Sequence, residues 1–462
     1  MLPPETHVLS TLEADGSRRW LKPKLSRGKL LTRRRFVAYF LIAIFTLVPF
    51  VRVGGRPLVL LDITSRQFTI FGFTFLPTDT ILLAIFVVGF LLGIFLFTAL
   101  FGRVWCGWAC PQTVYLEFLF RPIERLFDGT RGRGGPKKKN AGWRVVAKFV
   151  VYFLLCIYVA NTFLAYFIGV EELKTWVTQS PVKHPVPFAV MTLVTLAMMV
   201  NFYYFREQMC LIACPYGRFQ SVLLDQSSMI VAYDRKRGNP RGKKKKCQEK
   251  SQDSTLPVIG DCVDCGNCVA TCPTGIDIRD GLQMECINCA QCIDACNAVM
   301  SKIGRPANLI RFSSQANDEG LHTRMLRART VIYPMLLCGL AVAFFAVFLS
   351  GKSFDAVLLR EPGNPYVLTD SGDVRNLLRL KITNRVDPEM ALSVECLSPS
   401  SAVVEMQEKE PSVSGRGVET FHLSVVAPRN EFEQGRSKVN LKITNQNDES
   451  RTIQLQLIGP YN

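Results

Sequence analysis

Histidine is scarce in this sequence, and the common motifs of nucleotide-binding and hydrolytic enzymes are missing from it. The chain has 4 histidines among 462 residues, and none has a second histidine at helical spacing, which argues against a haem held by two histidines in a membrane. No Walker motif, dinucleotide fingerprint or hydrolase triad is present. No small-residue cleavage site follows the first apolar run, so we expect no cleaved signal peptide.

Cysteine, by contrast, is abundant, and its distribution indicates metal binding. The chain has 16 cysteines, and half of them lie between Cys262 and Cys296. A disulfide framework would spread them more evenly, whereas a dense window of thiols is typical of a metal centre. The formal net charge is +17. In a membrane protein such an excess reflects Lys and Arg in cytoplasmic loops, so we expect no nucleic-acid partner.

Long apolar runs predict an α-helical membrane domain embedded in a lipid bilayer. Hydrophobic residues make up 48% of the chain, and a run of roughly 20 apolar residues crosses a bilayer as a helix. In a soluble protein, runs of this kind would need far more polar surface to cover them. We expect five spans, two hairpins and a final anchor, near residues 36–53, 79–101, 146–168, 186–205 and 329–350.

The basic residues of the connecting loops predict how these spans are oriented. Segments 1–35, 102–145 and 206–261 are rich in Lys and Arg, whereas 54–78 and 169–185 are poor in them. Rich and poor loops alternate, and the positive-inside rule places the rich ones in the cytoplasm.

The polar N-terminal segment and the long segment 206–328 are therefore predicted to be cytoplasmic. We expect residues 1–30 to be poorly ordered. An odd number of spans puts the tail, 351–462, on the opposite face of the membrane.

This tail has a different composition, which predicts an all-β domain. Apolar and polar residues alternate in short runs bounded by Asn, Asp, Gly and Pro, a pattern typical of strands. About seven such strands in roughly 100 residues predict a sandwich of immunoglobulin type. Cys396 is its only cysteine, so the intersheet disulfide of antibody domains cannot form. We expect the tail to act as an interaction or spacer module without chemistry of its own.

The eight clustered cysteines have the spacing of a bacterial two-cluster ferredoxin. The pattern C-x2-C-x2-C-x3-C occurs twice, ending first in Cys272-Pro273 and then in Cys296-Asn297. Structural zinc is the alternative, but two fourfold repeats favour two 4Fe–4S clusters in a ferredoxin-like segment near 255–305. The fourth cysteine of each repeat reaches the other cluster. The predicted ligand sets are Cys262, Cys265, Cys268 and Cys296 for one cluster, and Cys272, Cys286, Cys289 and Cys292 for the other.

Two further cysteine pairs share the pattern C-x3-C-P, and we call them together the four-thiol group. Cys106 and Cys110 follow the second expected span, and Cys210 and Cys214 follow the fourth. If these segments stay helical, each pair lies on one face about one turn apart, and the two pairs can meet between hairpins. Soft thiolates there would suit Cu(I). A dithiol–disulfide relay and a packing role beside a proline break are the alternatives.

Long stretches of the chain resemble the cytochrome c oxidase accessory proteins of the CcoG/FixG/RdxA type. The resemblance covers nearly the whole chain from about residue 35. It rests on the eight-cysteine segment and on RVWCGWACPQTVYLEFLFRPIER, FREQMCLIACPYGRFQSVLLDQSSMIVAYDRKRGNPRG and CNAVMSKIGRPANLIRFSS. It implies a multi-pass protein of the bacterial inner membrane, with a periplasmic immunoglobulin-like tail.

The resemblance also implies a function in building cbb3-type cytochrome oxidase. Members of the family reduce Cu(II) to Cu(I), so the clusters would store electrons. Cys106, Cys110, Cys210 and Cys214 would handle copper or pass the electron on. The implied partners are the oxidase assembly machinery, copper chaperones or a copper transporter, and an electron donor that the resemblance does not name.

Two other functions fit the same residues. One is a quinol-linked electron conduit, as in the membrane polyferredoxins of nitrate and nitrous-oxide respiration. The other is an assembly scaffold whose clusters only stabilise the fold. The residues themselves indicate clusters in a membrane protein, and the expected activity is that of an oxidoreductase that transfers electrons.

Overall fold

The computed structural model divides into two compact units, Met1–Val342 and Ala343–Asn462. The structure describes residues 10–13, 15–53, 56–63, 67–71, 73–75, 80–128, 142–242, 260–321, 327–349, 353–369, 371–386, 388–406, 408, 411–415 and 417–460.

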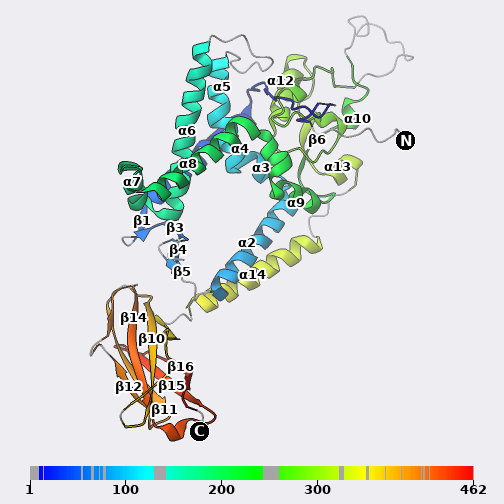
Figure 1. Ribbon diagram of the computed structural model, residues 1–462. Helices are drawn as coiled ribbons and strands as arrows, with labels where there is room; N and C mark the ends of the chain where they lie inside the picture. Colours follow the sequence, from blue (N-terminus) through cyan, green and yellow to red (C-terminus); the bar gives the residue numbers. More distant parts are fainter. Residues whose placement is uncertain are drawn as a thin grey trace, which may run out of the picture. The chain divides into compact units, whose positions relative to one another are not determined.

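Four segments among the described residues are helical, long and apolar enough to cross a membrane. Each lies within four residues of an expected span, and α6 packs against α8 in the first unit (Figure 1). The segments are α2 (Thr80–Phe101), α6 (Gly142–Ile168), α8 (Pro185–Met199) with its π-helical continuation η3 (Val200–Phe205), and α14 (Ala328–Leu349).

The first expected span, 36–53, is not among these four. α1 (Lys29–Leu47) ends inside this range, at Leu47, and is followed by a single 3-10 turn that contains Pro49. The first turns of α1 are basic, and Arg34 is fully buried. The apolar helical part therefore begins at Phe36 and is about 18 Å long, shorter than the roughly 30 Å core of a bilayer. Five spans are not confirmed, and the opposite placement of the tail, which depends on their odd number, stays a prediction.

Short strands and one helix connect the long helices. The connection from α1 to α2 forms two small antiparallel sheets, β1–β2 and β3–β4–β5. The bounds are β1 (Arg52–Val53), β2 (Arg56–Pro57), β3 (Val59–Asp62), β4 (Gln67–Ile70), β5 (Phe73–Phe75) and α7 (Val170–Thr178), which follows α6.

The described part of the N-terminal segment is ordered against the ferredoxin-like segment. The backbone N–H of Lys24 donates to the carbonyl of Ala270 at 2.8 Å, and the Thr271 hydroxyl donates to the Lys24 carbonyl at 2.6 Å. Leu21 is buried. The expected disorder was therefore wrong from residue 10 onward, because main-chain hydrogen bonds leave no mark in composition. Residues 1–9 and 14 lie outside the described residues.

The ferredoxin-like segment is built on a two-stranded antiparallel sheet of β6 (Ile230–Tyr233) and β7 (Ile310–Ser313). Two helices, α11 (Asn267–Ala270) and α12 (Gln291–Lys302), follow its two cysteine loops. Residues 243–259, at its expected start, lie outside the described residues.

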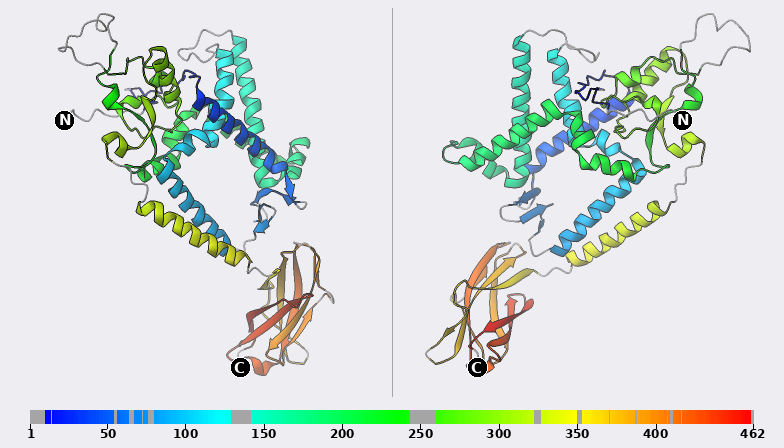
Figure 2. Two further views of the ribbon diagram at one scale, coloured as in Figure 1. Left: turned by 180° about the vertical axis from the view of Figure 1, so that it is seen from behind. Right: turned by 45° about the vertical axis from the view of Figure 1, so that its right-hand side comes forward.

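The start of α1 lies against α12, as both views in Figure 2 show. The Asp294 carboxylate of α12 accepts the backbone N–H groups of Leu30 and Leu31 at 3.3 and 2.8 Å. A carboxylate at this place satisfies orphan donors of the helix start and favours its dipole. The first helix is thereby joined to the ferredoxin-like segment.

The second unit contains two antiparallel sheets, as the alternating pattern predicted. One sheet has the order β12–β14–β10–β8, with β9 paired to β10, and the other has the order β13–β11–β15–β16. Alternate residues of β10 and β15 are buried in one apolar core, and Cys396 is a free thiol at its edge. The strands are β8 (Phe354–Arg360), β9 (Val367–Leu368), β10 (Val374–Asn384), β11 (Met390–Ser398), β12 (Val403–Met406), β13 (Ser412–Val413), β14 (Val418–Ala427), β15 (Arg436–Asn445) and β16 (Ser450–Ile458).

Candidate iron–sulfur and thiol site

The eight clustered cysteines surround two cavities, and each cavity brings one predicted ligand set together. Apolar side chains such as Ile278 and Leu309 complete the walls. Ligation itself stays a prediction. The first cluster cavity is lined by Cys262, Cys265, Cys268 and Cys296, and the second by Cys272, Cys286, Cys289 and Cys292, with Cys268 between the two.

The two cysteine loops repeat one backbone conformation. Asp264 and Asn288 stand at equivalent positions with φ of 53° and 52°, and Gly266 and Ala290 follow with 64° and 60°. Residues other than glycine rarely adopt positive φ, so the recurrence indicates a shared constraint. Turns of this kind form concavities of backbone N–H groups that suit an anionic iron–sulfur centre. The residues present therefore fit two 4Fe–4S clusters.

The C-x3-C-P motifs lie on a series of short helical elements next to the ends of α2 and η3. Two of these elements, η2 and η4, are π-helical, a conformation often found at functional sites. The elements are α3 (Val104–Trp108), α4 (Pro111–Tyr115), η2 (Leu116–Phe120), α5 (Arg121–Asp128), η4 (Met209–Ala213) and α9 (Pro215–Leu223).

Each motif breaks its helix, so the condition that these segments stay helical is not met. Cys106 and Cys210 lie within α3 and η4, whereas Cys110 and Cys214 have extended backbones with ψ of 126° and 111°. The reason is the proline that follows, which disfavours the helical conformation for the residue before it. Proline is also favoured at the first position of the next helix, which here is α4 or α9.

The structure nevertheless brings the two pairs together as free thiols. Burial raises the pKa of Cys106 to about 11 and that of Cys210 to about 12, and the nearby thiols of Cys110 and Cys214 add to both shifts. Cys106 Sγ donates to Gln220 Oε1 at 3.0 Å. Within the described residues, no three or more His, Cys, Asp or Glu side chains are arranged to hold a single metal ion. In a cubane cluster each thiolate binds a different iron atom, so single-ion geometry is not required there.

The four-thiol group adjoins the second cluster cavity directly. Cys106 packs with Ile287 and Cys289 in one buried apolar cluster. A Cβ atom on Gly107 would lie 2.4 Å from the carbonyl oxygen of Ile287 and 2.9 Å from the Cα of Cys289. Only glycine permits this approach of α3 to the second cysteine loop.

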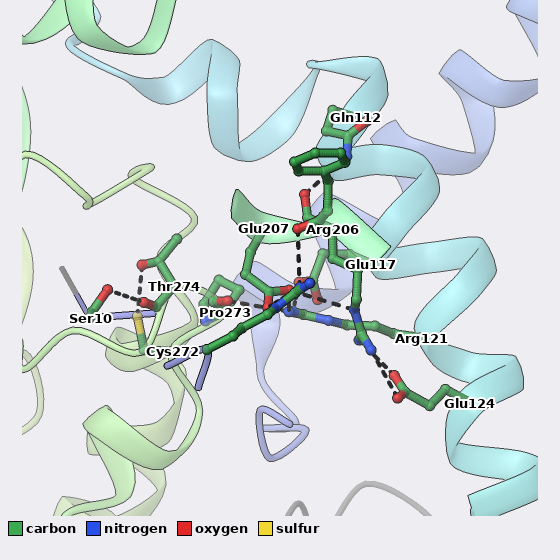
Figure 3. A network of polar contacts seen from close by, with 12 residues as sticks. Ser10, Gln112, Glu117, Arg121, Glu124, Arg206, Glu207, Cys272, Pro273 and Thr274 are labelled. Carbon is green, nitrogen blue, oxygen red and sulfur yellow. Dashed lines mark hydrogen bonds and ion pairs between the residues drawn. The ribbon is translucent and has the colours of Figure 1, made fainter. Parts of the chain in front are cut away.

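Buried charges fix this arrangement to the loop after Cys272. Arg121 is 2% exposed, pairs with Glu117 and Glu207, and donates to the carbonyl of Pro273 at 3.2 Å (Figure 3). Charges removed from water are costly unless they are paired and hydrogen-bonded. The pairing of Arg121 therefore specifies how α5 meets the ferredoxin-like segment.

A second buried arginine, Arg206, connects the two halves of the membrane domain. It donates to both carboxylate oxygens of Glu124 at 3.0 and 2.7 Å, and its carbonyl accepts from Gln112 Nε2 at 3.1 Å (Figure 3). Burial would raise the pKa of Glu124, but the attraction of Arg206 and its cationic neighbours outweighs burial and lowers this pKa to about 2. Glu124 is therefore ionised at neutral pH.

Comparison with known proteins places the chain in a family. Residues 205–315 match a family described as a 4Fe–4S dicluster domain, 83–131 a 4Fe–4S binding domain, and 344–460 the immunoglobulin-like fold at the C-terminus of FixG. Protein RdxA of Cereibacter sphaeroides is 33% identical over 382 residues, which cover 78% of this chain and 79% of RdxA. The chain belongs to the FixG/RdxA family.

Two further comparisons accompany this assignment. The nitrogen fixation protein FixG of Rhizobium meliloti is 30% identical over 419 residues, which cover 82% of this chain and 79% of FixG. The crystal structure of a FixG-related protein from Vibrio parahaemolyticus matches 24% of this chain and 98% of its own, with 16% identity and a TM-score of 0.20.

Membership of the FixG/RdxA family confirms the resemblance found in the sequence. The protein is a membrane iron–sulfur electron carrier with a C-terminal immunoglobulin-like domain. The match over 83–131 includes Cys106 and Cys110, so one C-x3-C-P motif lies in a segment shared with iron–sulfur proteins.

The buried arginines are the residues that the sequence interpretation missed and that hold the elements of the site together. Arg34 is fully buried and donates to the carbonyl of Gly107 at 2.5 Å. A basic residue near the end of a span is normally read as a topology signal. A signal was present for Arg121, because Glu117 stands four residues before it, at the spacing of a helical ion pair.

Proposed function

We propose that the protein reduces Cu(II) to Cu(I) at the four-thiol group, for the assembly of a cbb3-type oxidase. The observation that carries this proposal is the packing of Cys106 against Ile287 and Cys289. Sulfur groups suited to Cu(I) thus lie in contact with the wall of the second cluster cavity.

The chemistry asked of the protein side chains is modest. The clusters, when bound, supply one-electron redox chemistry. One electron converts Cu(II) to Cu(I), and the electron transfer itself makes and breaks no bond. The thiols offer soft ligands that favour Cu(I) over harder competitors, and no three of them are already arranged around a single metal ion, which suits a substrate that must leave again.

The surrounding assignments belong to the same proposal. The positive loops support a bacterial inner-membrane protein whose N-terminal and ferredoxin-like segments face the cytoplasm and whose sandwich faces the periplasm. Copper would come from a chaperone or transporter, and the sandwich would contact the oxidase assembly machinery.

Single-turnover oxidation tests this proposal. Full-length protein in lipid nanodiscs is reduced with dithionite, freed of reductant and mixed anaerobically with Cu(II) and a Cu(I)-specific chelator. We expect cluster oxidation and one Cu(I) per electron released, and no oxidation with redox-inert Zn(II). Equal cluster oxidation by Cu(II) and Zn(II) would sink the proposal.

Cysteine variants locate the copper site in the same experiment. The double variant Cys110→Ser/Cys214→Ser should slow Cu(I) formation by about 100-fold, because soft ligands are replaced by hard ones. Cys338→Ser, an exposed thiol of α14, is the matched control and should have no effect. X-ray absorption of copper-loaded protein should show sulfur ligands that the double variant loses. If the copper–sulfur signals were unchanged in that variant, copper would bind at other residues.

A further inference from the structure

A separate cavity of about 710 Å³ lies beside Cys272 and has no part in the proposed copper chemistry. Its wall is formed by the N-terminal stretch 19–23, Glu124 of α5, the helix α6, residues 203–206 at the end of η3, and residues 269–275 of the ferredoxin-like segment. The volume is typical of sites for small organic ligands. We call it the donor cavity.

The donor cavity has aromatic side chains at the edge of the membrane domain. Trp20, Tyr203 and Tyr204 line it and are 49%, 42% and 53% exposed, and the rings of Trp20 and Tyr204 meet edge to face. Tyr203 and Tyr204 are among the last residues of the candidate span Pro185–Phe205. Exposed Trp and Tyr gather at the membrane–water interface, so a lipid-soluble molecule can reach the cavity from the bilayer.

Two polar groups of opposite sign stand in the same wall. Lys22 Nζ is shielded from solvent, lies 3.5 Å from Asp128 Oδ2 and makes no hydrogen bond with any residue that the structure describes. The Glu124 carboxylate lines the cavity as well. An ammonium group donates to a carbonyl oxygen, and a carboxylate accepts from a hydroxyl group.

The remaining cations of the wall are already committed to carboxylates. Lys148 pairs with Asp128 at 3.0 Å, Arg206 holds Glu124, and Arg19 lies 3.9 Å from Glu13. A flavin or nicotinamide nucleotide would bring phosphate groups that need free cations or clustered N–H groups. The donor cavity therefore favours an uncharged aromatic ring with oxygen substituents.

We propose that the donor cavity binds the headgroup of a membrane quinol, and that this quinol is the electron donor of the protein. Oxidation of one quinol to quinone breaks two O–H bonds and releases two protons and two electrons. The two protons pass to water, with the Glu124 carboxylate as a hydrogen-bond acceptor for a ring hydroxyl group, and two one-electron carriers on the eight clustered cysteines take up one electron each. The position of Cys272 in the cavity wall places the acceptor beside the ring. The inference rests on the proposed function only for the final acceptor, copper.

Photoaffinity labelling tests quinone binding without any turnover. Full-length protein in nanodiscs is irradiated with an azido-ubiquinone, and labelled peptides are identified by mass spectrometry. We expect labels on the peptides that contain Trp20 or Tyr203 and Tyr204, and we expect excess decylubiquinone to suppress them. The proposal would be overturned if only other peptides were labelled, or if excess decylubiquinone did not suppress the labelling.

A filling substitution and a matched control make the test specific. Ala270 lines the donor cavity and stands two residues after Cys268, whereas exposed Ala298 on α12 stands two residues after Cys296. Ala270→Phe should lower labelling by about tenfold, and Ala298→Phe should leave it unchanged. Equal labelling of the two variants would refute the site.

The lysine pair keeps the test decisive if Ala270→Phe loses iron. Lys22→Met removes the donor for the carbonyl oxygen and should weaken quinone binding by about tenfold. Lys24→Met, at an exposed residue bonded to Asn267, should not change it. Identical binding by the two lysine variants would contradict the proposed pose.

Cluster reduction separates this inference from the copper proposal. Decylubiquinol should reduce the clusters in the absence of copper, and Ala270→Phe should slow that step by about tenfold while dithionite reduction stays normal. Reduction by FMNH2 or NADH but not by quinol would overturn the inference. The copper experiment begins from dithionite-reduced protein, so either proposal can fail alone.

Discussion

The two cysteine loops share one backbone conformation but lie in different surroundings. In the first loop Asp264 and Cys265 are exposed, whereas in the second loop Asn288, Cys289 and Ala290 are buried, and Cys289 packs against Cys106 of α3. Local sequence thus sets the shape of a loop, and tertiary packing sets its role. The second cluster cavity touches both the four-thiol group, through Cys289, and the donor cavity, through Cys272.

Removing one cysteine from each loop should separate the two roles most strongly. Cys289→Ala and Cys265→Ala should each lose about half of the bound iron, because each removes one ligand of one cluster. Cu(I) formation should fall by about 100-fold in Cys289→Ala but by less than about tenfold in Cys265→Ala. If the rate of Cu(I) formation fell equally in the two variants at matched iron content, both loops would carry the electron to copper.

Charge pairs near the two loops should differ in their contribution to stability. Arg121→Met removes the ion pair of Glu117 and one of the three arginines around Glu207, and it should lower the free energy of unfolding by about 3–5 kcal/mol. Arg241, whose side chain is 30% exposed, lies 3.5 Å from Asp280. Arg241→Met should cost less than about 1 kcal/mol. Thermal unfolding of the two variants in nanodiscs measures both losses of stability. Similar losses in the two variants would contradict the contrast in burial.

The close approach of α3 to the second loop can be tested with one methyl group. Gly107→Ala should destabilise the protein by about 1–3 kcal/mol, because the added Cβ meets backbone atoms that cannot turn aside. Gly93→Ala in α2 meets nothing within 4 Å and should be neutral or stabilising by about 0.5–1 kcal/mol. A neutral Gly107→Ala would mean that the loop does not contact α3.

Chelator-driven iron loss should show the smallest difference. The exposed Cys265 leaves the first loop open to solvent, so about half of the iron should leave roughly threefold faster than the rest. Iron release followed at a visible chelator band should then have two phases. A single phase would indicate that both loops are equally accessible.

The sequence predicted the parts of the site that depend on local spacing. The two ligand sets, four long helices and the all-β tail follow from short-range patterns, and the structure places the corresponding residues together. The contact of Cys106 with Cys289 could not be predicted from local spacing, because more than 100 residues separate them in the chain. Proline after Cys110 and Cys214 gave a signal for the helix breaks that the helical interpretation set aside.

The donor cavity had no signal in the sequence at all. Its wall combines Trp20, Tyr203 and Cys272, which come from three distant segments. The failed prediction of disorder between residues 10 and 30 had the same origin, since the described N-terminal residues are held by contacts with residues more than 200 positions away. Long-range contacts of this kind depend on the finished fold.

The bond between Asp294 and the start of α1 has a consequence for biosynthesis. Leu31 precedes its partner by 263 residues, and at about 5–20 residues per second the ribosome needs roughly 13–53 s to make that distance. Because α12 also carries Cys292 and Cys296, iron delivery and the docking of the first helix occur at the same late stage. The start of α1 can therefore dock only after the segment with these cysteines has been made, and we expect a cell short of iron to accumulate copies whose N-terminal helix has not docked.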